Sequence, residues 1–98
     1  MYVVVQHNFS NPEAAWSRGT ALIEGRGAPE GTRVLQFYPR VDGSAATCLW
    51  ESRSVDDVQR FVDTTLGDAS VNACYEVDGE KAFADSPSLS SAPHTIAG

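Results

Sequence analysis

The segment from Cys48 to Val62 constrains the fold of this chain more than any other stretch. It reads Cys-Leu-Trp-Glu-Ser-Arg-Ser-Val-Asp-Asp-Val-Gln-Arg-Phe-Val, in which a strand-like alternation gives way to apolar residues at helical spacing. Ser54 is suited to cap the helix, and Asp56 and Asp57 favour the positive end of the helix dipole. The segment therefore predicts a strand that passes through a helix cap into an amphipathic helix.

The rest of the chain predicts three further strands and one further helix. Consecutive valines indicate the first strand, an Asn-Pro-Glu start signal indicates the first helix, and Asp42-Gly43 indicates a hairpin turn between the two middle strands. In the second strand, alternation predicts Leu35 and Phe37 on one face, with Val34 and Tyr38 on the other. The predicted strands are Tyr2 to Phe9, Thr32 to Pro39, Ala45 to Ser52 and Val71 to Val77, and the predicted helices are Pro12 to Glu24 and the segment between Ser54 and Gly67.

This element order, βαββαβ, predicts an α+β fold of the ferredoxin-like type with a four-stranded antiparallel sheet. Right-handed crossovers put the first and third strands in the centre, so the expected strand order is 4-1-3-2. Two helices cover one face of such a sheet and leave the other open, and such an open face becomes a dimer interface or a ligand cavity. We expect a homodimer, arranged as a dimeric α+β barrel. We expect one domain over residues 1–84 and a flexible Ser/Pro-rich tail over residues 85–98.

The net negative charge argues against two classes of binding partner. Seven basic and thirteen acidic residues give a formal charge of −6, which repels phosphate backbones and anionic lipids. Neither nucleic acid nor a membrane is therefore expected as a partner. Residues 1–7 have no basic region and a short apolar run, which is typical of a strand and not of a signal peptide. A cytoplasmic location is expected.

The two cysteines, Cys48 and Cys74, are predicted to be free thiols. A reducing compartment disfavours a disulfide. In the expected sheet, their strands also flank the first strand and lie roughly 9 to 10 Å apart, whereas a disulfide needs Cα atoms closer than about 7 Å.

His7 is the one histidine inside the predicted fold, since His94 lies in the tail. An imidazole at a strand end can be a general base, a metal ligand or a hydrogen-bonded structural group. With Cys48, and with Cys74 on the other neighbouring strand, it would form a Cys/His cluster that suits a borderline divalent metal. Tyr38 and Trp50 are candidates to line a ligand cavity beside His7, or to pack in the core or interface. No catalytic residue is assigned.

The stretch from Ala46 to Arg60, followed by Tyr75-Glu-Val, resembles small actinobacterial proteins of the dimeric α+β-barrel type, nearest to an uncharacterised family that includes nickel-binding members. The resemblance covers approximately residues 2–78 and lies in a Cys-Leu-x-Glu strand, a Ser-x-x-x-Val helix start and a Glu-Val final strand. The first strand of that family often ends in histidines, and His7 stands at the corresponding place. The resemblance implies nickel or another divalent metal, with His7 as a ligand.

Three functions are compatible with these features, and they leave open whether the protein is an enzyme. The first is a homodimer that binds a small ligand or a metal through His7, Tyr38 and Trp50, or through His7 and Cys48. The second is a cofactor-independent monooxygenase or polyketide-type cyclase, which fold analogy suggests for the barrel cavity. The third is an interaction or scaffold protein that engages a protein partner through residues 85–98.

Overall fold

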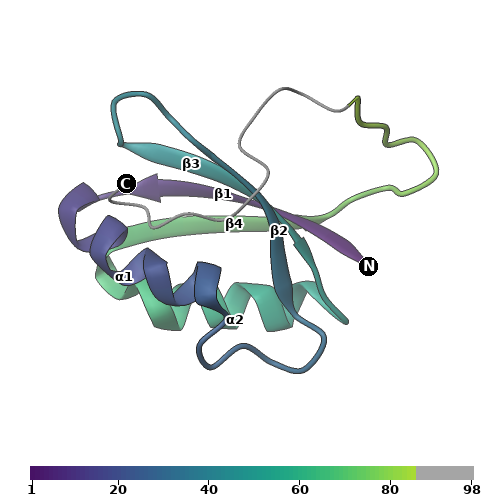
Figure 1. The fold of residues 1–98 in the computed structure, drawn as a ribbon, viewed down its shortest axis with the longest axis horizontal. Helices are drawn as coiled ribbons and strands as arrows, with labels where there is room; N and C mark the ends of the chain where they lie inside the picture. The colour runs from purple at the N-terminus through teal and green to yellow at the C-terminus, as the bar shows by residue number, and fades with distance from the viewer. Residues whose placement is uncertain (86–98) are drawn as a thin grey trace.

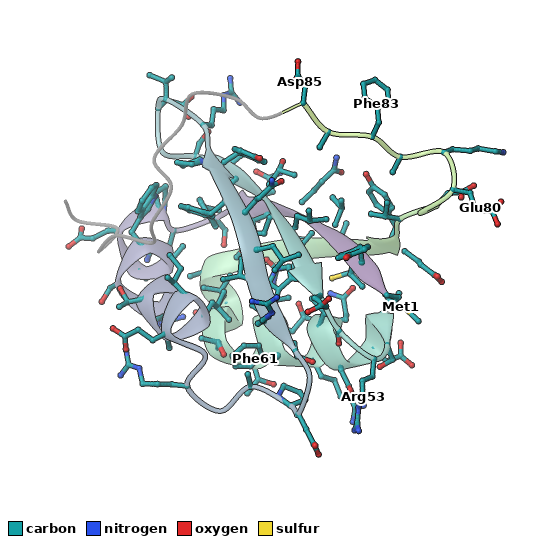
Figure 2. All side chains as sticks on the ribbon, turned by 45° about the vertical axis from the view of Figure 1, so that its right-hand side comes forward. Met1, Arg53, Phe61, Glu80, Phe83 and Asp85 are labelled. Atoms are coloured by element: carbon teal, nitrogen blue, oxygen red, sulfur yellow. The ribbon has the colours of Figure 1, made fainter. Side chains whose placement is uncertain are left out.

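The computed structural model describes residues 1–85 of the chain. Its elements confirm the βαββαβ order: β1 (Tyr2–Phe9), α1 (Pro12–Glu24), β2 (Arg33–Pro39), β3 (Ala45–Glu51), α2 (Val55–Leu66), a 3-10 turn η1 (Gly67–Ala69) and β4 (Ser70–Glu76). Figure 2 shows Phe83 and Asp85 on the segment that leaves the sheet after β4. Apart from Asp85, the predicted tail lies outside the described residues. Neither helix in this part of the chain has the length and apolar character needed to cross a bilayer.

The helices begin and end at the sequence signals. The side chain of Asn11 accepts a hydrogen bond from Ala14 N at 3.2 Å, so Asn11 caps α1. Gly25 ends that helix with a left-handed φ of 72°, a conformation that glycine adopts without steric cost. Ser54 caps α2 as predicted, because its hydroxyl accepts from Asp57 N at 3.0 Å.

The strands form one antiparallel sheet in the order β2-β3-β1-β4, which is the predicted order read from the other edge. β1 is central and pairs with both β3 and β4. Val5 lies opposite Cys48 on one side and opposite Cys74 on the other. A whole strand therefore separates the two cysteines, and both are free thiols, as predicted.

Both helices pack on the same face of the sheet (Figure 1). Because residues paired across strands point to the same face, Val3 and Val5 of β1 and Trp50 of β3 all face the helices, and all are fully buried. They join the apolar stripe of α2 in one core, whose largest fully buried side chains are Trp50, Leu66, Val3, Val5, Val58 and Val62. The opposite face of the sheet carries no helix in the described part of the chain, which confirms the predicted covered and open faces.

The predicted side-chain alternation of β2 is wrong. The pairing of β2 with β3 shifts between Val34, which lies opposite Trp50, and Gln36, which lies opposite Leu49. This irregularity leaves Leu35 without a pairing partner, as in a β-bulge. Val34 and Phe37 therefore face the helices together, although strict alternation would place them on opposite faces.

The packing predicts that truncating Leu66 lowers the free energy of unfolding more than truncating Leu35 does. Leu66→Ala should lower the free energy of unfolding by about 2–5 kcal/mol, because Leu66 is 2% exposed and its loss leaves a cavity in the core. Leu35→Ala removes the same atoms from a residue that is 36% exposed at the bulge, and should cost less than about 1 kcal/mol. Urea denaturation of both variants tests this. Equal losses would contradict the assignment of the bulge.

Candidate functional site

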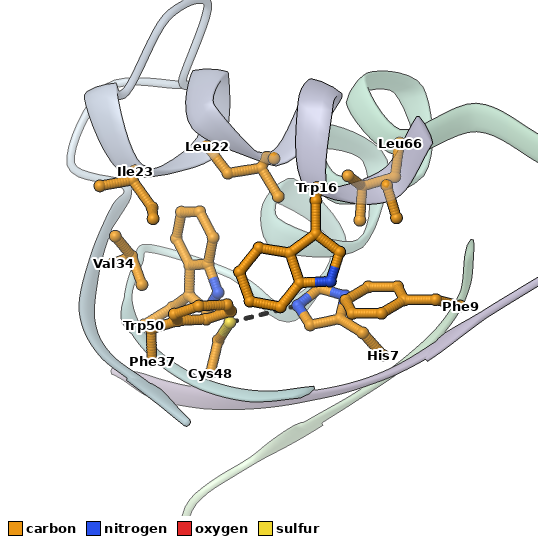
Figure 3. A pocket seen from close by; sticks show the side chains of 12 residues that line it. His7, Phe9, Trp16, Leu22, Ile23, Val34, Phe37, Cys48, Trp50 and Leu66 are labelled. Atoms are coloured by element: carbon orange, nitrogen blue, oxygen red, sulfur yellow. Dashed lines mark hydrogen bonds between the residues drawn. The ribbon is translucent and has the colours of Figure 1, made fainter. Parts of the chain in front are cut away.

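A small cavity lies between α1 and the helix-covered face of the sheet (Figure 3). Its volume is about 30 Å³, which is enough for a water molecule or a group of similar size. The lining is mainly apolar and comes from every element except β4 and η1: His7, Phe9, Ala15, Trp16, Gly19, Leu22, Ile23, Val34, Phe37, Cys48, Trp50 and Leu66.

His7 and Cys48 meet on one wall of this cavity. In the sheet His7 lies opposite Ala46, and Cys48 lies two residues further along β3 on the same face. Such diagonal neighbours are within reach of a long side chain. The Nε2 atom of His7 lies 3.2 Å from the Sγ atom of Cys48, and each residue is 4% exposed. The thiol and the imidazole therefore form a buried hydrogen-bonded pair.

The second ring nitrogen of His7 is held by β4. Its Nδ1 atom lies 2.7 Å from Oδ1 of Asn72, the residue opposite His7 in that strand. Asn72 is itself fixed: Ser70 Oγ donates to the same Oδ1 atom at 2.6 Å, and Asn72 Nδ2 donates to Asp63 of α2 at 2.9 Å. Since Asn72 Oδ1 can only accept, His7 carries its proton on Nδ1 and donates it. The lone pair of Nε2 then accepts the hydrogen of the Cys48 thiol.

Burial keeps this pair neutral. It lowers the pKa of His7 from 6.5, although the hydrogen bond to Asn72 and the charge of Asp63 oppose the shift. It raises the pKa of the Cys48 thiol from 9.0 to about 12. Near neutral pH the site therefore contains an uncharged imidazole and a protonated thiol.

The third polar group at the cavity is the indole N–H of Trp50. Trp50 is fully buried, and its Nε1 atom has no hydrogen-bond partner among the described residues. Figure 3 shows this nitrogen on the side of the indole ring that faces Cys48, and as a donor directed at the sulfur, a weak acceptor, it opposes the rise that burial causes in the pKa of the thiol. By contrast, Trp16 donates its N–H to Gly43 O at 3.1 Å. An unsatisfied buried donor costs about 1–3 kcal/mol, so the Trp50 N–H favours an added acceptor.

The structure brings together three of the residues singled out in the sequence. His7, Cys48 and Trp50 line one cavity, whereas Tyr38 does not. Tyr38 lies opposite Thr47, on the open face of the sheet, and is 39% exposed. The expected approach of His7 to a second cysteine is replaced by the bond to Asn72, because Cys74 lies opposite Val5.

Asn72 is the site residue that sequence reasoning missed. The signal was present in the predicted topology, because an antiparallel neighbour of β1 must place some residue opposite His7. The register that selects Asn72 depends on where β4 starts, and the strand begins at Ser70, one residue before the predicted start.

The donor atoms do not make a complete metal centre. Within residues 1–85 there is no group of three or more His, Cys, Asp or Glu side chains placed to hold a metal ion. His7 and Cys48 supply two donors that are bonded to each other, whereas zinc sites use three or four protein ligands. A second copy on the open face would be separated from the pair by the sheet. Nickel therefore does not fit this pair of residues alone.

Comparison with known proteins supports the fold. No protein-family model matches the sequence, and no curated protein matches it. Among solved structures, that of Rv0793 from Mycobacterium tuberculosis is similar, with a TM-score of 0.52 and 16% sequence identity. The match covers 83% of this chain and 98% of that chain. At this identity the likeness shows a shared α+β fold and nothing about the cavity.

The shifted pKa values predict a stability maximum between about pH 6.5 and about pH 9. Below this range the unfolded chain binds a proton at His7 that the native state resists, so acidification lowers the free energy of unfolding. Above it the unfolded chain loses a proton at Cys48 that the native state retains, so stability falls again. Urea denaturation across this pH range measures both limbs.

The His7→Gln variant is the control for the acid limb. Glutamine has no proton to gain between about pH 6.5 and about pH 5, where most carboxylates remain ionised. The decline in stability over that interval should therefore become smaller in the variant than in the natural chain. An unchanged decline would show that His7 is not buried in its neutral form.

Proposed function

We propose that this protein binds a small, mainly apolar molecule with one hydrogen-bond acceptor in the cavity between the sheet and α1. The observation that carries this proposal is the fully buried Trp50 N–H, which has no partner in the described chain and lies at an apolar cavity. The thiol of Cys48 donates to His7 and its sulfur is only a weak acceptor, so the indole N–H that faces it lacks a full hydrogen bond. An apolar pocket with few convergent polar groups is the usual form of a small-molecule site.

The size of the cavity limits the ligand. Sites for drug-sized molecules measure about 300–1,000 Å³, whereas this cavity measures about 30 Å³. As it stands it holds one group of about the size of a water molecule, so a larger ligand must displace part of the lining. Such dimensions favour binding of a small group over a monooxygenase or cyclase that encloses a polycyclic substrate.

The aromatic pair formed by Trp16 and Phe37 indicates where a longer ligand would extend. Their rings meet edge to face with centroids 6.0 Å apart, and both side chains are partly exposed. One ring comes from α1 and the other from β2, so the contact joins the two elements at the rim of the cavity. Turning either ring outward would enlarge the cavity without disturbing the paired strands around β1.

We also propose that the protein is a homodimer that buries the open face of the sheet. Large side chains are exposed there, including Tyr2 at the start of β1 and Val71 and Tyr75 on β4. Tyr75 lies opposite Val4, and Val71 lies opposite Asn8, so all three share the face without helices. Exposed apolar residues gathered on one sheet face favour association. A role for residues 85–98 in binding a protein partner remains a prediction.

Ligand binding should be visible at the indole N–H of Trp50. Titration with small ketones and amides, such as acetone and N-methylacetamide, should shift the Trp50 Nε1–H resonance downfield as it gains an acceptor. The Trp16 signal should move less, because its N–H already donates to Gly43 O. We expect affinities near the millimolar range, since so few ligand atoms supply little binding energy. Two-dimensional ¹H–¹⁵N NMR measures both signals.

Two variants on adjacent residues of β2 control that experiment. Val34→Phe adds volume on the cavity side of the strand and should abolish the shift of Trp50. Leu35→Phe adds similar volume at the bulge, outside the cavity, and should leave the shift intact. Failure of every probe to move the Trp50 signal in the natural chain would refute the proposed binding site.

The proposed interface predicts a change of mass in solution. Val71→Asp and Tyr75→Asp should each convert a dimer into a monomer, because each places a charge on the open face. Val41→Asp, on the fully exposed turn between β2 and β3, should leave the mass unchanged. Light scattering after size-exclusion chromatography gives the mass. A natural chain that is monomeric at high protein concentration would exclude this dimer.

A further inference from the structure

We propose that Cys48 accepts an acyl group from a small thioester or activated ester, with His7 as the general base. This step rests on the proposed binding site, because the acyl group must occupy the cavity beside Trp50. It goes beyond binding by giving a chemical role to the buried thiol.

The geometry has the three parts that an activated nucleophile needs. The thiol of Cys48 donates to Nε2 of His7 at 3.2 Å, and Nδ1 of the same ring donates to Asn72 at 2.7 Å. The base is therefore in contact with the nucleophile and is oriented by a third group, which is the arrangement of Cys-His-Asn proteases on an unrelated fold. A protonated thiol beside a neutral imidazole can react by transferring its proton during the attack, as a serine hydroxyl does in a triad.

The surroundings of His7 stabilise the proton that the ring takes from the Cys48 thiol. Asp63 of α2 accepts hydrogen bonds from Asn72 and from Gln59, which hold its carboxylate in place. The side chain of Asn72 bridges this carboxylate and the imidazole ring of His7. Its negative charge favours the imidazolium form of His7. The side chains that α1 contributes to the cavity carry no charge, and on β4 the nearest titratable group is the thiol of Cys74. Asp63 is thus the charge that stabilises a protonated His7.

The reaction balances without an oxidant or a cofactor. The Sγ atom forms a bond to the carbonyl carbon while the thiol proton moves to Nε2 of His7. The carbonyl oxygen, now negative, accepts a hydrogen bond from the free N–H of Trp50. The bond from carbon to the leaving group then breaks, and the leaving group takes the proton from His7. The products are a thioester on Cys48 and the free thiol or alcohol. A cavity of about 30 Å³ favours the smallest acyl groups, such as acetyl, and even these require the aromatic rim to move outward.

The test compares two cysteines within the same molecule. We would treat the protein with p-nitrophenyl acetate and locate hydroxylamine-sensitive acetyl groups by peptide mass spectrometry. Cys74 is more exposed than Cys48 but has no hydrogen bond to a histidine in the described chain. Simple accessibility therefore predicts faster labelling of Cys74, whereas the proposal predicts faster labelling of Cys48. Cys74→Ala should not change the rate at Cys48.

The dependence on pH provides a second readout. An unassisted thiol with a pKa near 12 should react in proportion to hydroxide up to that pH, about tenfold per pH unit. General-base catalysis should instead give a rate that is level from about pH 7 to about pH 9, because His7 is already neutral there. His7→Gln should lower the rate about 100-fold and restore the dependence on hydroxide.

The outcomes separate the inference from the proposed function. Labelling of Cys74 before Cys48, or a rate at Cys48 that follows hydroxide in the natural chain, would overturn the acyl transfer, and neither result requires a variant that folds. If small ketones still shift the Trp50 N–H signal in that case, ligand binding stands and the reaction alone is refuted. If Cys48 is not labelled first and the Trp50 N–H signal also does not shift, both the acyl transfer and the ligand site are refuted.

Discussion

The position of β1 at the centre of the sheet is the constraint on which the rest of the structure depends. It pairs with β3 and β4 along nearly its whole length, so one register fixes three strands. Alternation places Val3, Val5 and His7 on the side of the helices, and a slip of one residue would turn all three to the open face. The same register puts Asn72 opposite His7 and Cys48 diagonally across from it. The register of β1 therefore determines both the core and the candidate site.

Two polar side chains are buried at this core, and they differ in whether their nitrogen atoms have hydrogen-bond partners. His7 is as buried as its apolar neighbours, yet each ring nitrogen has a partner, so burial costs little beyond the loss of its charged form. Trp50 gains a large apolar area and an edge-to-face contact with Phe61, whose ring centroid is 5.8 Å away, but its N–H is unpaired. Replacing the donor with carbon would remove that cost, and the acceptor of the proposed ligand would remove it while the indole stays in place.

The sequence predicted the fold well and the site in part, for physical reasons that differ between residues. Period-two and helical patterns, together with the caps Ser54 and Gly25, are local signals, and they give the right elements and the right sheet order. The bulge at Leu35 is set by pairing with β3, which no local pattern reveals, and it reverses the face assigned to Val34. Register likewise decides that Asn72, and not Cys74, meets His7. That Trp50 is buried follows from alternation, but its lack of a hydrogen-bond partner depends on the packing of the whole core.

The proposed ligand site and the proposed dimer interface lie on opposite faces of the sheet. The hydrogen bonds of His7 join β1 to β3 and β4, and Asn72 continues them to Asp63 of α2, so the wall of the cavity formed by these elements is tied together. α1 makes none of the ladder hydrogen bonds of the sheet, and its side-chain bonds run from Trp16 to Gly43 O and from Arg18 to Leu66 O and Asp68. A ligand that enlarges the cavity would therefore displace α1 or its aromatic rim and leave the strands in place. Because the open face belongs to those strands, a dimer formed there would stiffen the register that positions His7 without closing the route to it.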